Sequence, residues 1–288
     1  MSTAPDGSPV ELYVRLRPAG EPELIASVLP PGASVLELGC GTGRIADALV
    51  GLGHPTIGVD QSAAMLAHVH RATPVLANIE GLDLGRRFEG VVLASHLVNT
   101  AEPAQRRAFL ATCARQVDPR GVVLVERHDP AWVAQVDAGP LGERDGVRFA
   151  LEGVTRNDDR LSATSVYVID GRELRHRWTA QILDDAALDR ELAAVGLPAF
   201  ASSTRRRHGR SARPRSSLFD MGDERHAPCG HVPTRLASPW ASLAHRPSWH
   251  RHHQARTRLS SPRPCHLRAI RSTTPPVHHG QPRTLPVT

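Results

Sequence analysis

Short hydrophobic runs alternate with segments of helical period through the first half of the chain. Ser34–Leu38 (SVLEL) is typical of a buried strand, and a glycine-rich turn separates it from a helix expected over Arg44–Gly51. The same unit recurs, with strands expected at Thr56–Val59, Pro74–Ala77, Phe88–Ala94 and Gly121–Glu126 and helices at Ser62–His70 and Glu102–Val117. Strands separated by helices predict an α/β fold with a Rossmann-like, doubly wound, mostly parallel sheet.

The pattern changes after Ala131, where polar and apolar residues alternate over longer stretches. Three such stretches are separated by Asn157–Asp159 and by Asp170-Gly171, a two-residue hairpin signal. The stretches are Val147–Arg156, Leu161–Ile169 and Glu173–Leu183. They predict an antiparallel insertion after the fifth strand, over about residues 147–183. Asp184–Val195 then has the pattern of an amphipathic helix that ends at Gly196.

Charge divides the chain into two unlike parts. The net charge is +6, yet residues 1–200 carry 19 Arg against 26 acidic residues, whereas residues 201–288 carry 16 Arg against three. In this tail Arg, Ser, Pro and His fill 48 of 88 positions, so little apolar surface is present to offset the entropy of ordering. We therefore expect one folded domain over residues 1–200 and a disordered Arg/His/Pro/Ser-rich tail over residues 201–288.

The composition also limits the cellular setting and the metal chemistry. Met1–Val10 lacks the features of an export signal, and no apolar run approaches the roughly 20 residues that span a bilayer. The four cysteines show no CxxC spacing, so neither a disulfide framework nor a metal site is predicted. We expect a cytoplasmic protein that has no membrane partner.

The turn Gly39-Cys-Gly-Thr-Gly43 is the main candidate for ligand binding. A dinucleotide fingerprint needs a small residue where Arg44 stands, and a Walker loop needs a lysine, which the chain lacks altogether. Glu37, two residues before the turn, would repel a pyrophosphate and suits a ligand that carries an ammonium group.

The segment Glu37-Leu-Gly-Cys-Gly-Thr-Gly43 resembles the E/D-x-G-x-G-x-G motif of class I S-adenosylmethionine-dependent methyltransferases. The resemblance covers about residues 10–200 and continues through Gly58–Ser62, Asn78–Leu82, Phe88–Ser95 and Asp118–Gly121. It implies S-adenosyl-L-methionine as the cofactor and methyl transfer as the reaction.

The resemblance also implies how the first two strands would hold the cofactor. The backbone of Gly39, Gly41 and Gly43 would approach its methionine and ribose parts, since only glycine leaves room there. Glu37 would lie near the amino group, and Asp60, which ends the second strand, would accept hydrogen bonds from both ribose hydroxyls.

By the same resemblance, the adenine would lie between residues that follow the second and third strands. Gln61 and Met65 would flank the ring, and Ile79 would offer its backbone N–H and an apolar face. Asn78 stands where the family usually has Asp and can still accept from the adenine amino group. Ser95 would line the sulfonium end. A core role for Met65 and a turn-capping role for Asn78 are the alternatives.

An N-terminal segment of the family folds over the ligand, and Tyr13, Arg15 and Arg17 resemble it. A solvated surface strand is an equally good interpretation of these three residues. Methyl transfer is an in-line displacement that depends on alignment and on water exclusion. A base would help some acceptors, and His96 and His128, which follow the fourth and fifth strands, are the candidates. A surface or capping role is the alternative for each.

The sequence does not identify the methyl acceptor. Insertions usually select it in this fold, so residues 147–183 are expected to form a wall of its site, with Tyr167, His176 and Trp178 as facing residues. A plain sheet would give the same alternation. No N-P-P-Y-like signature follows the fourth strand, so we expect a small-molecule acceptor and no nucleic-acid partner.

Members of this family normally end in a β-hairpin whose last strand pairs antiparallel with strand five. The resemblance is lost at about Phe200, so the terminal hairpin is expected to be missing, which would leave strand five with an open edge and impair activity. A change of reading frame is the leading explanation of the tail. The alternatives are a tail that binds nucleic acid or another polyanion, and a non-catalytic methyltransferase-like protein.

Overall fold

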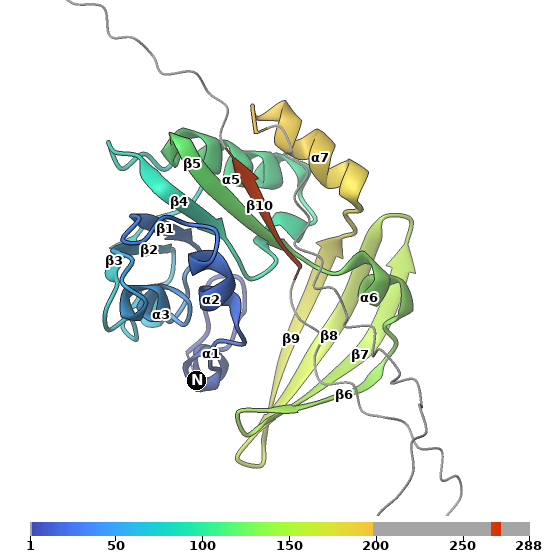
Figure 1. The fold of residues 1–288 in the computed structure, drawn as a ribbon. Coiled ribbons are helices and arrows are strands. Elements are labelled where there is room, and N and C mark those ends of the chain that lie inside the picture. Colours follow the sequence, from blue (N-terminus) through green and yellow to red (C-terminus); the bar gives the residue numbers. More distant parts are fainter. Residues whose placement is uncertain (1, 198–265, 272–288) are drawn as a thin grey trace, which may run out of the picture. The chain divides into compact units, whose positions relative to one another are not determined.

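The computed structural model describes residues 2–197 and 266–271 of the 288-residue chain. They form a six-stranded sheet in the order β10-β5-β4-β1-β2-β3 and a four-stranded antiparallel sheet, β6-β7-β8-β9 (Figure 1). The first sheet is parallel except for β10. Its strands are β1 (Val35–Leu38), β2 (Thr56–Asp60), β3 (Thr73–Leu76), β4 (Phe88–Leu93), β5 (Val117–Arg127) and β10 (His266–Arg271). The predicted doubly wound α/β fold is confirmed.

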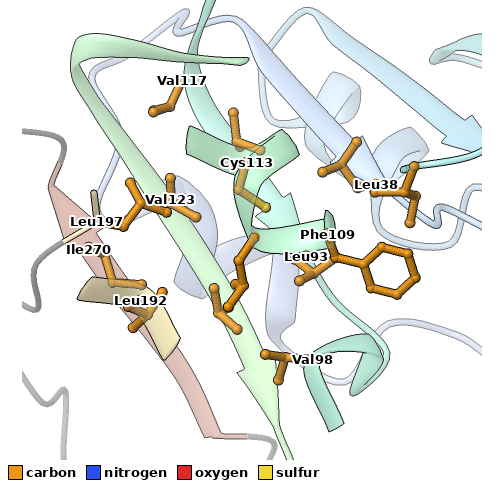
Figure 2. Close-up of a cluster of buried hydrophobic side chains, with 14 of the residues drawn as sticks. Leu38, Leu93, Val98, Phe109, Cys113, Val117, Val123, Leu192, Leu197 and Ile270 are labelled. Carbon is orange, nitrogen blue, oxygen red and sulfur yellow. The ribbon is translucent and has the colours of Figure 1, made fainter. Parts of the chain in front are cut away.

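Helices cover both faces of this sheet, which is why its central strands are apolar on both sides. One face packs against α5 (Pro103–Gln116) and α7 (Asp185–Ala194), whose Phe109 and Leu192 join Leu38 and Leu93 in the largest buried cluster (Figure 2). The other face packs against α2 (Glu21–Ala26) and α3 (Ala46–Gly51). The alternation of strand side chains therefore divides the core into two layers.

Several local signals fix where the elements begin. Ser62 caps α4 (Ala63–Leu66), its hydroxyl accepting from the Met65 N–H at 3.3 Å, and Asp184 caps α7. The helix expected over Ser62–His70 is shorter than predicted. Short helices that the sequence does not predict are α1 (Val10–Arg15), α2, α6 (Pro130–Gln135) and the 3-10 turn η1 (Leu97–Asn99).

The antiparallel insertion is present, with one strand more than predicted. It consists of β6 (Gly139–Arg144), β7 (Val147–Asn157), β8 (Arg160–Ile169) and β9 (Arg172–Gln181). Asp170 and Gly171 both have positive φ, 50° and 79°, as the predicted hairpin turn requires. Asp145 and Gly146 form an equivalent turn between β6 and β7.

The C-terminal strand corrects the expectation of an open edge on strand five. β10 pairs antiparallel with β5 from His266↔Arg127 to Arg271↔Val122, so one strand of the expected terminal pair is present and part of the tail is ordered. Ile270 is buried in the cluster of Figure 2, whereas Leu267 and Ala269 pack on the opposite face. Because successive side chains of a strand point to opposite faces, these six residues contribute apolar side chains to both faces of the sheet.

Contacts along the chain divide it into two units, and the first, which includes Met1–Thr204, is compact. Every described residue belongs to the first unit, and the rest of the predicted tail lies outside the described residues. Within the described part, no helix has both the length and the apolar character needed to cross a membrane.

Candidate functional site

A pocket opens where the carboxyl ends of β1, β2 and β4 meet, the usual ligand site of an open α/β sheet. Most of the predicted cofactor residues line it: Glu37, Gly39, Gly41, Asp60, Gln61, Met65, Ile79 and Ser95. Gly43, Asn78, His96 and His128 are not among its lining residues. The motif-derived positions therefore meet in space, whereas the two histidines lie outside the pocket wall.

The glycine turn follows β1 directly and is held against β2. The N–H groups of Gly39 and Cys40 donate to the Val59 carbonyl at 2.8 and 2.9 Å. Gly39 and Gly43 have φ of 73° and 80°, in the left-handed region that favours glycine. A Cβ on Gly43 would lie 3.1 Å from the Val69 side chain, so this glycine provides close packing of the turn rather than pocket surface.

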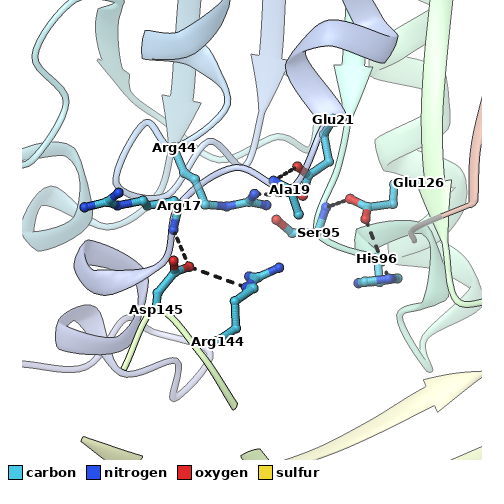
Figure 3. A network of polar contacts seen from close by, with 9 residues as sticks. All are labelled: Arg17, Ala19, Glu21, Arg44, Ser95, His96, Glu126, Arg144 and Asp145. Atoms are coloured by element: carbon cyan, nitrogen blue, oxygen red, sulfur yellow. Dashed lines mark hydrogen bonds and ion pairs between the residues drawn. The ribbon is translucent and has the colours of Figure 1, made fainter. Parts of the chain in front are cut away.

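Glu37 is a buried carboxyl with an unused oxygen. Its side chain is 2% exposed, and Oε2 has no hydrogen-bond partner among the described residues. Burial raises the pKa of Glu37 to about 8, although the nearby Arg44 guanidinium opposes that rise. Arg44 itself is paired with Glu21 of α2 at 2.7 Å (Figure 3). A cationic group of a ligand would fit at Glu37, because it would stabilise the ionised carboxylate.

Asp60 is held in one orientation at the end of β2. Its Oδ2 accepts from the Gly41 N–H at 2.9 Å and its Oδ1 accepts from the Ser62 N–H at 2.8 Å. Each carboxylate oxygen has a second lone pair, and Asp60 lines the pocket. The side chain can therefore accept from a pair of hydroxyl groups without losing its own anchors.

Farther along the pocket the wall is apolar. Met65 and Ile79 are 3% and 8% exposed and line it. Asn78 is exposed and lies outside the lining, whereas Glu80 does line the pocket and accepts from Gln105 Nε2 at 3.0 Å. Asn78 stands between Ala77 and Ile79, which both line the pocket, but is not itself among the lining residues.

The N-terminal segment covers part of the pocket, which the sequence predicts only through Tyr13, Arg15 and Arg17. Tyr13 and Arg15 lie in helix α1, not in a surface strand. Ala4, Asp6, Ser8 and Tyr13 line the pocket, and Thr42 Oγ1 donates to the Tyr13 carbonyl at 3.1 Å. No motif marks residues 4–8, so only their position in the fold identifies them.

Contacts with the antiparallel sheet hold this N-terminal segment in place. His176 Nε2 lies 3.2 Å from the Asp6 carbonyl, and the Arg17 N–H donates to Asp145 at 3.0 Å. The insertion thus reaches the pocket through the N-terminal segment.

His96 and His128 lie together although they follow different strands. Their rings stack with centroids 4.1 Å apart and an interplanar angle of 11°. Trp132 and Trp178 each stack on His128, with centroids at 5.7 Å. Desolvation and the charge of Arg44 lower the pKa of His96 to about 4, and burial also lowers that of His128. Both rings are therefore neutral at physiological pH.

Glu126, at the end of β5, is a site residue that the sequence interpretation omits. It is 1% exposed, accepts from the Ser95 N–H at 2.6 Å and lies 3.7 Å from His96 Nε2 (Figure 3). The sequence signal that could have identified Glu126 is an acidic residue near the carboxyl end of an apolar strand, which is also the position of Glu37. The described residues contain no group of three or more His, Cys, Asp or Glu side chains suited to a metal ion.

Sequence comparisons identify relatives of the N-terminal half. A family model described as "Methyltransferase domain" matches residues 35–121. An uncharacterized methyltransferase of Mycobacterium tuberculosis is 32% identical over 146 residues, 49% of this chain and 59% of the relative, so this chain spans little more than half of that protein. The dTDP-3-amino-3,4,6-trideoxy-alpha-D-glucopyranose N,N-dimethyltransferase of Streptomyces venezuelae is 30% identical over 167 residues, 54% of this chain and 69% of the relative.

Solved structures share the architecture. The methyltransferase CcbJ of Streptomyces caelestis matches 64% of this chain and 81% of its own, with a TM-score of 0.55 and 24% identity, which supports the fold alone. The sugar N-methyltransferase KedS8 of a Streptoalloteichus species matches 69% of this chain and 89% of its own, with a TM-score of 0.54 and 25% identity.

Proposed function

Because the chain belongs to the class I S-adenosylmethionine-dependent methyltransferase family, we propose that its pocket binds S-adenosyl-L-methionine and that the protein methylates a small molecule. The observation that carries this proposal is the buried carboxyl of Glu37, whose Oε2 has no partner among the described residues. A buried polar atom without a partner is costly, so a ligand ammonium at this position is favoured on both electrostatic and hydrogen-bonding grounds.

The remaining pocket residues fit the other parts of the same ligand. Asp60 offers lone pairs to the two ribose hydroxyls while its backbone bonds hold it in place. Met65 and Ile79 offer apolar surface to the adenine, and Gln61 lies beside them in the pocket wall. Ser95 is placed to line the sulfonium end. Asn78 is exposed beside Ile79, and its contact with the adenine amino group stays a prediction.

When bound, S-adenosyl-L-methionine would supply an electrophilic methyl group to a lone pair of the acceptor, with the sulfur left as a neutral thioether and the acceptor's proton released to solvent. The chain contributes alignment and water exclusion, the latter through the N-terminal segment over the pocket. His96 and His128 stack beside Ser95 and are the groups proposed to meet the acceptor.

Two named relatives support a proposal for the acceptor class. One is named as an N,N-dimethyltransferase of a dTDP-linked amino sugar, and one solved neighbour as a sugar N-methyltransferase. In this chain Trp132 and Trp178 flank His128 and present aromatic surface beside the two imidazoles. Aromatic rings suit a ring-shaped small molecule, so nucleotide-linked amino sugars are the first acceptors to assay.

Calorimetry with S-adenosyl-L-methionine tests the cofactor proposal without an acceptor. We expect the wild-type chain to bind and Asp60→Ala to bind about 10- to 100-fold more weakly, because hydrogen bonds to a charged group contribute about 1.5–3 kcal/mol. Asp83→Ala is the matched control, since Asp83 accepts from Gly85 in an exposed turn that does not line the pocket. A soluble, monodisperse wild-type sample that gives no binding heat would refute the proposal.

A further inference from the structure

We infer that Glu126 is a positioning residue for His96: it fixes the neutral imidazole with its proton on Nε2, so that Nδ1 keeps a lone pair for an N–H or O–H of the methyl acceptor. The inference rests on the proposed methyltransferase function. It assigns a role to a buried carboxylate beside the pocket that takes part in none of the proposed cofactor contacts.

The Glu126 carboxylate has a separate task for each oxygen. Oε2 accepts the Ser95 backbone N–H at 2.6 Å, and Oε1 faces His96 Nε2 at 3.7 Å, which is longer than a hydrogen bond (Figure 3). An ionised carboxylate can only accept. The nitrogen that faces it is therefore favoured as the N–H donor, which leaves the other ring nitrogen as the acceptor.

The backbone next to His96 supports a constrained geometry. Ser95 and His96 are consecutive non-glycine residues with positive φ, 55° and 59°, a backbone conformation that is unfavourable for residues with a side chain. The bond from the Ser95 N–H to Glu126 helps to hold this turn, and the turn places the ring against His128 at 4.1 Å. An unfavourable backbone conformation persists only where surrounding contacts hold it, and the hydrogen bond from Ser95 to Glu126 is such a contact.

His96 can be reached by a ligand. It stands between Ser95 and Leu97, which both line the pocket, and 32% of its side chain is exposed. Other charged groups near the ring are Arg44, which disfavours an imidazolium, and Glu21, which is paired with that arginine. A neutral ring is a hydrogen-bond acceptor that orients a nucleophile over the whole physiological pH range, because it does not titrate there.

Nitrogen NMR of the full chain labelled with [15N]histidine tests this inference at pH 7 without ligand. The His96 signals are assigned by their loss in His96→Gln. We expect the Nε2–H tautomer in the wild type and the Nδ1–H tautomer in Glu126→Gln. The reversal is expected because the amide oxygen of the glutamine stays with the Ser95 N–H, which turns the NH2 group toward His96 Nε2.

Two controls are built into the same chain. Glu89→Gln changes a carboxylate that also accepts a backbone N–H, from Ser34 at 2.9 Å, and should leave His96 unchanged. The buried His54 has Nδ1 at 3.1 Å from the Ala33 carbonyl, which can only accept, so its spectrum provides the Nδ1–H reference.

A wild-type His96 protonated on Nδ1, or the same tautomer in wild type and Glu126→Gln, would overturn the inference. If Glu126→Gln does not fold, the wild-type spectrum still decides: Nε2–H supports the role of Glu126 and Nδ1–H removes it. The tautomer is independent of cofactor binding. A failed calorimetric titration would therefore refute the proposed function and leave the tautomer result intact. A wild-type His96 protonated on Nδ1 would refute the role of Glu126 and leave the proposed function intact.

Discussion

The docking of β10 on β5 can be tested at Ile270. This side chain is completely buried, and it packs in the cluster that also contains Val123 of β5 and Leu192 of α7 (Figure 2). Ile270→Ala would remove its outer methyl and methylene groups and leave a cavity. If the segment containing Ile270 packs as the structure describes, the substitution must destabilise the whole domain.

The expected cost follows from the burial. Truncation of a buried isoleucine to alanine destabilises by about 2–5 kcal/mol, and complete burial between a strand and a helix places Ile270 near about 3 kcal/mol. In a domain of this size that corresponds to a lowering of the melting midpoint by about 6 °C or more. Leu76→Ala is the matched control, because Leu76 is 61% exposed and its truncation should cost less than about 0.5 kcal/mol.

Urea unfolding followed by circular dichroism, together with thermal melting, gives both quantities for the two variants. If Ile270→Ala and Leu76→Ala are equally stable, β10 is not docked in solution and the edge of β5 is open, as the composition of the tail alone predicts. A loss of about 3 kcal/mol confined to Ile270→Ala would instead show that residues near the end of the chain belong to the folded domain.

Two further predictions concern the pocket. Glu37 has a pKa of about 8 in the free chain, so it is protonated at pH 6.5, whereas a cationic ligand group beside it favours the carboxylate. Binding of S-adenosyl-L-methionine should therefore release close to one proton. The release would make the calorimetric heat depend on the ionisation enthalpy of the buffer, and this dependence should vanish in Glu37→Gln. Wild-type heats that do not change with buffer would contradict this. Gly43→Ala should lower the free energy of unfolding in urea by about 3 kcal/mol, because the cost of its positive φ and that of the Val69 contact add. Gly53→Ala, with positive φ and open space around its Cβ, should lower it by about 1 kcal/mol. Equal losses in the two variants would exclude the Val69 contact as a cause.

The parallel strands and the β8–β9 hairpin are predictable from sequence because their signals are local. Apolar runs after turns mark β1 and β4, and Asp170-Gly171 has the residues that its turn conformation requires. β6 escapes prediction because Gly-Pro begins it and its apolar content is low, so only pairing with β7 defines it. β10 escapes prediction because it has only three apolar residues and lies in a segment rich in Arg, Pro and His.

The predictable part of the site is the part that a contiguous motif encodes. The glycine turn and Asp60 follow consecutive strands, so the sheet brings them together wherever that unit folds. Glu126 becomes a site residue only because β5 lies beside β4, which brings its carboxylate to Ser95. Asn78 illustrates the reverse: its alignment with the motif does not place it in the pocket wall.

The N-terminal segment over the pocket has a kinetic consequence. Part of what holds it is a pair of exposed ion pairs, Arg15 with Asp170 and Glu11 with Arg172, that join it to the antiparallel sheet. We expect opening of such contacts to speed the release of a ligand beneath the segment, so that they affect the exchange rate more than the equilibrium affinity. Exposed ion pairs are screened by salt. Ionic strength should thus set how quickly the spent cofactor is replaced between turnovers, even though no charge of these pairs belongs to the reaction itself.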